Sequence, residues 1–150
     1  RVRPGCRTAT VIAYFDTSAI VPLLIDEIGT PAAGQIWDQA ERLVSVRLSY
    51  VESRAALAQA ARIDRISQRH VRSAVRDLEG LLDQLDMVDI DVQLMRKAGE
   101  LAEDRGLRAY DAVHLAAAVR IQDPDLVVVA GDRALLAAAE ALGMSVAAIA

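Results

Sequence analysis

Four carboxylates in this 150-residue chain stand where a protein fold could gather negative charge. The first and the last of them closely follow runs of β-favouring apolar residues, and the other two lie in the first turns of predicted helices. In a parallel α/β sheet, the carboxyl ends of the strands and the starts of the following helices share one rim, where ligands bind. We therefore predict that four residues meet at that rim: Asp16, Glu52, Asp111 and Asp132.

Carboxylates at such a rim repel one another. Helix N-termini stabilise a carboxylate by only about 0.3–1 kcal/mol each, which does not offset several close charges. Either protons or a divalent cation must relieve the repulsion. Oxygen ligands without a set of His or Cys partners favour Mg²⁺ or Mn²⁺ over zinc. The sequence therefore predicts a site for Mg²⁺ or Mn²⁺.

The four acids differ in how easily a purely structural role explains them. Glu52 comes three residues after Ser49, so the pair could form only a helix capping box. Asp132 could only cap the helix that follows it. Asp111 lies among apolar neighbours and needs a specific partner, because an unpaired buried charge is costly. Asp16 follows a buried strand, and a structural role explains it least well.

Three further side chains near these acids need an interpretation. His114 comes three residues after Asp111 and can share its helix face. We interpret it as a structural histidine, because one imidazole fits poorly in an all-carboxylate site. Ser18 could hold the turn after the first strand or hydrogen-bond a metal-bound water. Trp37 is interpreted as a core or interface residue rather than a platform for nucleobases.

The elements that must position these residues alternate between strand and helix along the whole chain. Strands are predicted at 11–15, 43–46, 87–90, 126–130 and 145–149. Helices are predicted at 18–24, from a Thr30 N-cap to 41, and at 50–63, 68–85, 92–104, 109–121 and 133–142. This alternation is typical of an α/β fold with a mostly parallel sheet covered by helices on both faces. One domain is predicted over residues 11–150.

Composition narrows the class of protein. With 53% hydrophobic but only 3% aromatic residues, the core must be aliphatic. A net charge of −4 argues against a general polyanion binder. No apolar run approaches the roughly 20 residues of a membrane span, and the single cysteine, Cys6, fits a reducing cytosol. Residues 1–10 show no period, and we expect a disordered or non-native extension.

Four stretches resemble one known family: FDTSAIVPLL, SYVESRAALA, LRAYDAVHLAAA and VVVAGDRALLAAAEALGM. They are similar to the PIN-domain ribonucleases, and most of all to the VapC-type toxins of bacterial toxin–antitoxin pairs. The resemblance extends from Val11 onwards and implies a three-layer α/β/α sandwich. It places the four acids in the family's acidic quartet and Ser18 at the hydroxyl after its first Asp. One departure is Ala130, where the family often has Thr or Ser.

The resemblance implies a cytoplasmic, homodimeric endoribonuclease that needs Mg²⁺ or Mn²⁺ and is inhibited by a cognate antitoxin. Asp16 and Asp111 would contact the metal directly, and Glu52 and Asp132 would bind a second ion or its waters. Cations held in this way activate water and stabilise charge on the phosphate. The acidic site repels RNA, so basic side chains near it must help; the candidates are Arg54, Arg108 and Arg133.

The sequence is also compatible with two other classes of function. One is a catalytically degenerate PIN fold that only binds RNA or protein, which the missing hydroxyl at Ala130 permits. The other is a phospho-acceptor regulatory domain. Such a domain needs a lysine near its phosphorylated Asp, and the single lysine, Lys97, is predicted to lie in the middle of a helix.

Overall fold

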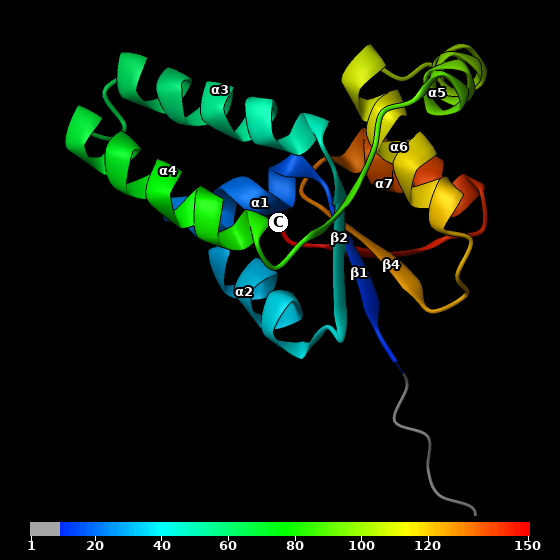
Figure 1. Ribbon diagram of the computed structural model, residues 1–150, viewed down its shortest axis with the longest axis horizontal. Helices are drawn as coiled ribbons and strands as arrows, with labels where there is room; N and C mark the ends of the chain where they lie inside the picture. Colours follow the sequence, from blue (N-terminus) through cyan, green and yellow to red (C-terminus); the bar gives the residue numbers. More distant parts are fainter. Residues whose placement is uncertain (1–9) are drawn as a thin grey trace, which may run out of the picture.

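A computed structural model describes residues 10–150, which form a five-stranded parallel sheet between two layers of helices (Figure 1). This confirms the predicted α/β class and the three-layer architecture. Of the predicted N-terminal extension, residues 1–9 lie outside the described part of the chain.

The five strands are ordered β3-β2-β1-β4-β5 across the sheet, and every neighbouring pair is parallel. They are β1 (Ile12–Phe15), β2 (Arg42–Val46), β3 (Asp86–Val88), β4 (Leu126–Ala130) and β5 (Ser145–Ala148). From β1 the chain builds one half of the sheet through β2 and β3, and then returns to add β4 and β5 on the other side of β1. The order therefore reverses between β1 and β4, and ligands in open α/β sheets bind beside such a switch point.

Four helices pack on one face of the sheet and three on the other. The first layer holds α1 (Thr17–Leu24), α2 (Thr30–Gln39), α3 (Leu48–Arg62) and α4 (Gln68–Leu82). The second holds α5 (Val92–Arg105), α6 (Ala109–Ile121) and α7 (Arg133–Ala141). No helix within residues 10–150 is both long and apolar enough to cross a membrane.

The alternation of β1 side chains divides them between the two cores. Tyr14 points into the core beneath α5, α6 and α7, whereas Phe15 points into the core beneath α1 to α4. Phe15 packs edge-to-face against Trp37, with 5.2 Å between the ring centroids. Trp37 is 9% exposed, which confirms its interpretation as a core residue. Both faces of β1 are buried, as its continuous apolar sequence indicates.

The predicted starts of the helices at 68 and 92 are confirmed by their capping contacts, whereas the predicted Thr30 N-cap is wrong. Ser67 and Asp91 accept hydrogen bonds at the starts of α4 and α5, and Gly106 ends α5 in the left-handed conformation (φ 63°). Thr30 is not the N-cap of α2, because Gly29 occupies that position. The Thr30 hydroxyl instead donates to the Pro22 carbonyl at 2.6 Å, which ties α2 to α1.

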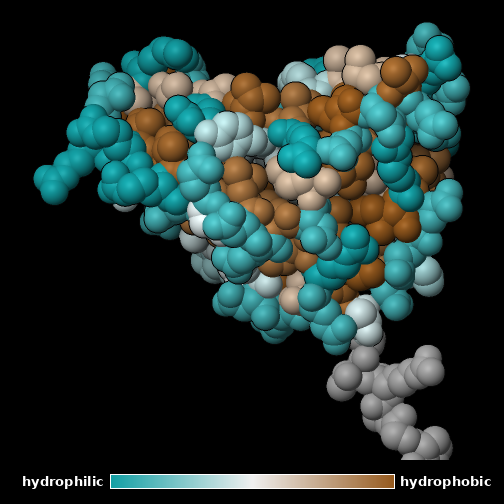
Figure 2. Space-filling view, viewed as in Figure 1, coloured by the Kyte–Doolittle hydropathy of each residue, from teal (hydrophilic) through white to brown (hydrophobic). Residues whose placement is uncertain are grey.

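The hairpin of α3 and α4 extends away from the sheet on the side opposite α5 (Figure 1). The surface is hollowed between this hairpin and the α5–α6 side, and apolar side chains show at its bottom (Figure 2). The carboxyl ends of the central strands lie at this end of the sheet, so the fold leaves open the rim where the acids are expected.

Candidate active site

Asp16 lies directly between β1 and α1 and caps the helix. Its carboxylate accepts hydrogen bonds from the backbone N–H of Ser18, at 3.1 Å, and from the Ser18 hydroxyl. The Ser18 oxygen in turn accepts the N–H of Gly131 at 2.9 Å. Ser18 therefore joins the loop after β1 to the loop after β4, across the switch point. The turn-holding contact predicted for Ser18 is present.

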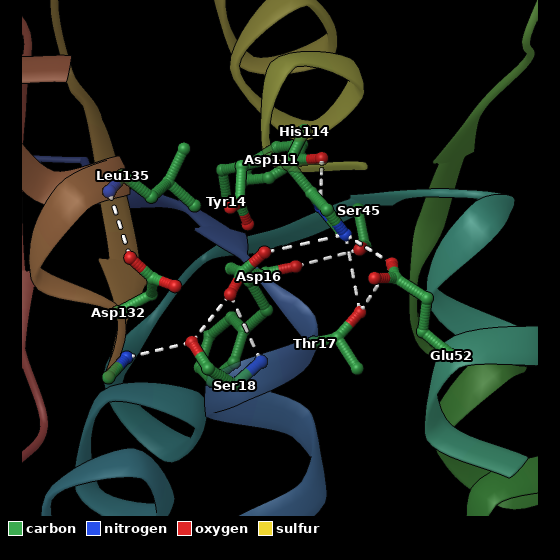
Figure 3. Close-up of polar contacts among 12 residues, drawn as sticks. Tyr14, Asp16, Thr17, Ser18, Ser45, Glu52, Asp111, His114, Asp132 and Leu135 are labelled. Carbon is green, nitrogen blue, oxygen red and sulfur yellow. Dashed lines mark hydrogen bonds and ion pairs between the residues drawn. The ribbon is translucent and has the colours of Figure 1, made fainter. Parts of the chain in front are cut away.

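Glu52 reaches the same place from α3, as Figure 3 shows. Its Oε1 accepts a hydrogen bond from the Thr17 hydroxyl at 2.9 Å and lies 2.6 Å from Nε2 of His114. The capping box that Ser49 and Glu52 could have formed is absent, and the predicted first-turn position of Glu52 is wrong. The helix begins at Leu48, so Ser49 already lies inside it, and Arg47 is the N-cap. Glu52 therefore stands beyond the first turn, and its side chain contacts other elements instead of its own backbone.

Asp111 and Asp132 are connected through Arg108. The guanidinium donates to Oδ2 of Asp111 at 3.2 Å and to Oδ2 of Asp132 at 3.3 Å. Asp111 lies in the first turn of α6, as predicted. Asp132 is the N-cap of α7 and accepts the N–H of Leu135 at 3.0 Å, so its predicted capping role is confirmed. Capping uses Oδ1 and leaves Oδ2 directed to Arg108.

Charge and burial both shift the pKa of Asp111, whose side chain is only 6% exposed. Burial is the largest cause that raises the pKa of Asp111, and the charge of Asp132 adds to it, while Arg108 opposes the rise. The same contacts raise the pKa of Arg108, mainly through its hydrogen bond to Asp111. Arg108 therefore opposes, but does not cancel, the effects of burial and of Asp132 on the pKa of Asp111.

His114 occupies the centre of the cluster and is 1% exposed. Its Nε2 faces Glu52, the Thr17 hydroxyl at 3.2 Å and Oδ1 of Asp16 at 3.4 Å. Its Nδ1 lies 2.9 Å from the Tyr14 hydroxyl. Burial lowers the pKa of His114, but the hydrogen bond to Glu52 and the nearby carboxylate charges outweigh burial and raise it overall. His114 is satisfied, as interpreted from sequence, yet its partners are the acids themselves.

The four predicted acids therefore come together at one rim (Figure 3). The three predicted basic residues differ in their surroundings. Arg108 lies against two of the acids. Arg54 instead donates to the Tyr50 hydroxyl at 2.8 Å and stacks over that ring. Arg133 begins α7 with an exposed side chain. Ala130 is fully buried at the end of β4, so the missing hydroxyl is replaced by apolar packing.

The donor set fits a hard divalent cation in its chemistry. Asp16, Asp111 and Asp132 offer only oxygen, which suits Mg²⁺ or Mn²⁺. As placed within residues 10–150, however, no three His, Cys, Asp or Glu side chains are arranged to hold one ion together. Arg108 takes the position of a counter-ion beside Asp111 and Asp132. An ion held by these two carboxylates would have to displace that guanidinium.

Two polar side chains of the cluster were not singled out from the sequence. Thr17 directly follows Asp16, and its hydroxyl holds Glu52. Tyr14 lies two residues before Asp16 inside an apolar strand, and a buried phenol there needs a hydrogen-bond partner. That need is the one signal that could have identified Tyr14. Its pKa is raised well above the usual value, first by burial and then by the charges of Asp16 and Glu52.

Comparisons with known proteins show the family of this chain. The family model of the PIN domain matches residues 13–141. This chain belongs to the PIN-domain family. It is 42% identical over 136 residues to ribonuclease VapC45 and equally to ribonuclease VapC49, both from Mycobacterium tuberculosis, covering 91% of this chain and 94% of each relative.

Solved structures share the PIN fold. PAE2754 from Pyrobaculum aerophilum superimposes with a TM-score of 0.65 at 26% identity, covering 85% of this chain and 84% of that one. A toxin–antitoxin complex from Klebsiella pneumoniae gives a TM-score of 0.59 at 16% identity, covering 80% of this chain and 86% of its counterpart. These similarities support the PIN-like resemblance seen in the sequence.

Proposed function

We propose that this PIN domain is an endoribonuclease that hydrolyses RNA phosphodiester bonds with a divalent cation, Mg²⁺ or Mn²⁺, held by its acidic cluster. The observation that carries the proposal is the meeting of Asp16, Glu52 and Asp111 around His114 at the switch point of the sheet. Its relatives VapC45 and VapC49 are both named as ribonucleases, which supports hydrolysis of RNA as the reaction.

Asp16 and Asp111 would hold the cation directly, because they are the two most buried of the four carboxylates. Glu52 and Asp132, whose side chains are each 21% exposed, would bind a second ion or its waters. When bound, a divalent cation supplies Lewis acidity for attack of water on the phosphodiester. Ser18 keeps Asp16 fixed through its hydroxyl, so that this carboxylate needs little reorganisation.

The arginine side chains near the rim can bind the phosphates of RNA. Arg108 is 65% exposed and lies next to the site, so a guanidinium released from Asp111 and Asp132 could pair with a phosphate. Arg133 is the second candidate, since it is exposed and next to Asp132 in the chain. Arg54 is the weakest of the three predicted contacts, because Tyr50 already engages it.

The wider biological role is a further part of this proposal. We infer a cytoplasmic toxin that forms a homodimer and is inhibited by a cognate antitoxin, as the resemblance to VapC proteins implies. A groove of about 630 Å³ beside the site offers room for such a partner; Thr17 and Ser18 line it together with Ile28. Ile28 is 92% exposed, and covering it would remove a large apolar side chain from water.

Cleavage of RNA by protein freed from any co-purified partner tests the function. We expect total RNA to be cut at discrete positions with Mg²⁺ or Mn²⁺, and the cutting to stop when EDTA removes the cation. Asp16→Asn should abolish cutting while its circular dichroism spectrum stays unchanged, because Asn can still cap α1. Asp38→Asn, an exposed change on α2, is the matched control.

Two outcomes would speak against the proposal. Equal cutting by wild type and Asp16→Asn would show that the cluster does not perform the reaction. RNA binding without any cutting in either cation would instead favour the degenerate binding module, which the apolar Ala130 permits.

A further inference from the structure

We propose that His114 is a positioning residue of the active site, which holds Glu52 in place beside Asp16 in an orientation set by Tyr14. This inference rests on the proposed metal-dependent function and adds a residue outside the four carboxylates.

Glu52 is held to the site by residues of other elements. Within the described part of the chain, its carboxylate receives hydrogen bonds from Thr17, on α1, and from His114, on α6. The contact to His114 is the shorter one, at 2.6 Å. Since α3 extends away from the sheet with α4 (Figure 1), these two contacts are what direct the Glu52 side chain into the cluster.

The His114 ring can supply this contact only if its Nε2 carries a hydrogen. Nε2 faces the carboxylates of Glu52 and Asp16, which only accept hydrogen bonds when ionised. A hydrogen at Nε2 therefore lies between two negative groups and lessens their repulsion. Because both protonated and neutral imidazole can carry a hydrogen at Nε2, the contact persists in either state.

Tyr14 fixes the other side of the ring. Its hydroxyl lies 2.9 Å from Nδ1 and is fully buried in the core beneath α6. The phenol can donate to a neutral Nδ1 or accept from a protonated one. In both cases it prevents the imidazole from rotating and directs Nε2 towards the acids. Partners of this kind commonly orient the ligands of metal sites, and their loss typically lowers metal affinity or activity by about 10–100-fold.

A purely structural histidine would behave differently. The core position of His114 could then be filled by any well-packed side chain, and only stability would change. The positioning role requires a hydrogen-bond donor at the place of Nε2. Two substitutions separate these roles: His114→Gln, whose amide can donate, and His114→Leu, which fills the space but cannot donate.

The test measures Mn²⁺ binding by electron paramagnetic resonance, together with kcat and KM for RNA and a crystal structure of the metal-free His114→Leu protein. We expect His114→Leu to raise the Mn²⁺ dissociation constant by about tenfold or more. It should lower kcat with little change in KM, and in its crystal structure Glu52 should turn away from Asp16. His114→Gln should recover most of the affinity. His70→Gln, at an exposed position on α4, should leave all values unchanged.

The inference is overturned if His114→Leu folds and binds Mn²⁺ like wild type, or if the Gln and Leu variants lose equal affinity. If His114→Leu does not fold, Tyr14→Phe gives the answer, because it keeps the ring and removes only the hydroxyl. It should weaken Mn²⁺ binding in the same direction by a smaller factor, and no change would overturn the inference. A wild type that binds no Mn²⁺ would refute the proposed function and this inference together. Normal metal-dependent cleavage with unaffected His114 variants would refute this inference alone.

Discussion

Replacing Ser18 by alanine should destabilise the fold measurably, because one hydroxyl joins two loops of the site. It donates to the Asp16 carboxylate and accepts the N–H of Gly131 at 2.9 Å. A hydrogen bond to a charged group contributes about 1.5–3 kcal/mol and a neutral one about 1 kcal/mol. Alanine regains about 0.5 kcal/mol through its higher helix propensity, and the backbone N–H of residue 18 can still donate to Asp16. We therefore expect a net loss of about 2–3.5 kcal/mol in the free energy of unfolding.

Urea denaturation followed by fluorescence measures this loss well. Trp37 is the single tryptophan of the chain and is buried against Phe15, so its emission reports unfolding of the core. Ser18→Thr, which keeps a hydroxyl, should recover part of the stability. Ser145→Ala, at an exposed position of β5, should change it by less than about 0.5 kcal/mol. A Ser18→Ala protein as stable as the Ser145→Ala control would show that the Ser18 hydroxyl does not stabilise the two loops.

Three further predictions concern other parts of the molecule. Leu78→Ala should cost about 2–5 kcal/mol of unfolding free energy by leaving a cavity beneath α4, whereas Ile63→Ala, at 55% exposure, should cost far less by the same denaturation assay. The pKa of Asp91 is lowered from 3.8 to about 2, mainly by the hydrogen bond from Arg120. The ionised Asp91 carboxylate should therefore stabilise the fold above about pH 4, and this stabilisation should disappear as the pH falls towards 2. The difference in unfolding free energy between wild type and Asp91→Asn should therefore shrink between pH 5 and pH 2; a constant difference would contradict this. Arg108→Gln should raise the pKa of Asp111 further, because Arg108 opposes the effect of burial; a carboxyl NMR titration of metal-free protein that shows no rise would contradict this.

The sequence was most informative where local pattern and tertiary structure agree. Apolar runs followed by Asp16 and by Gly131-Asp132 predicted two strand ends, and both are found beside the switch point of the sheet. The helix predicted at 92–104 likewise agrees with α5, which Asp91 caps and Gly106 ends in the left-handed conformation. At such positions the short-range chemistry of caps and turns determines the backbone, so a single sequence suffices.

Long-range contacts could not be predicted in the same way. Ser49 and Glu52 have the spacing of a capping box, but the helix begins two residues earlier than predicted, at Leu48, and the Glu52 side chain contacts His114 instead. The Tyr14–His114 contact joins residues 100 positions apart. Arg108 was expected to contact RNA, and its pairing with Asp132 depends on how α6 and α7 lie against each other. No local pattern specifies these distances.

Anomalous diffraction from a crystal soaked in Mn²⁺ locates the cation itself. We expect a strong anomalous peak between Asp16 and Asp111, with Arg108 turned away from the carboxylates, and no such peak in Asp16→Asn. A peak elsewhere on the molecule, or wild-type protein that takes up no Mn²⁺ while it still cuts RNA, would show that these carboxylates do not hold a catalytic cation.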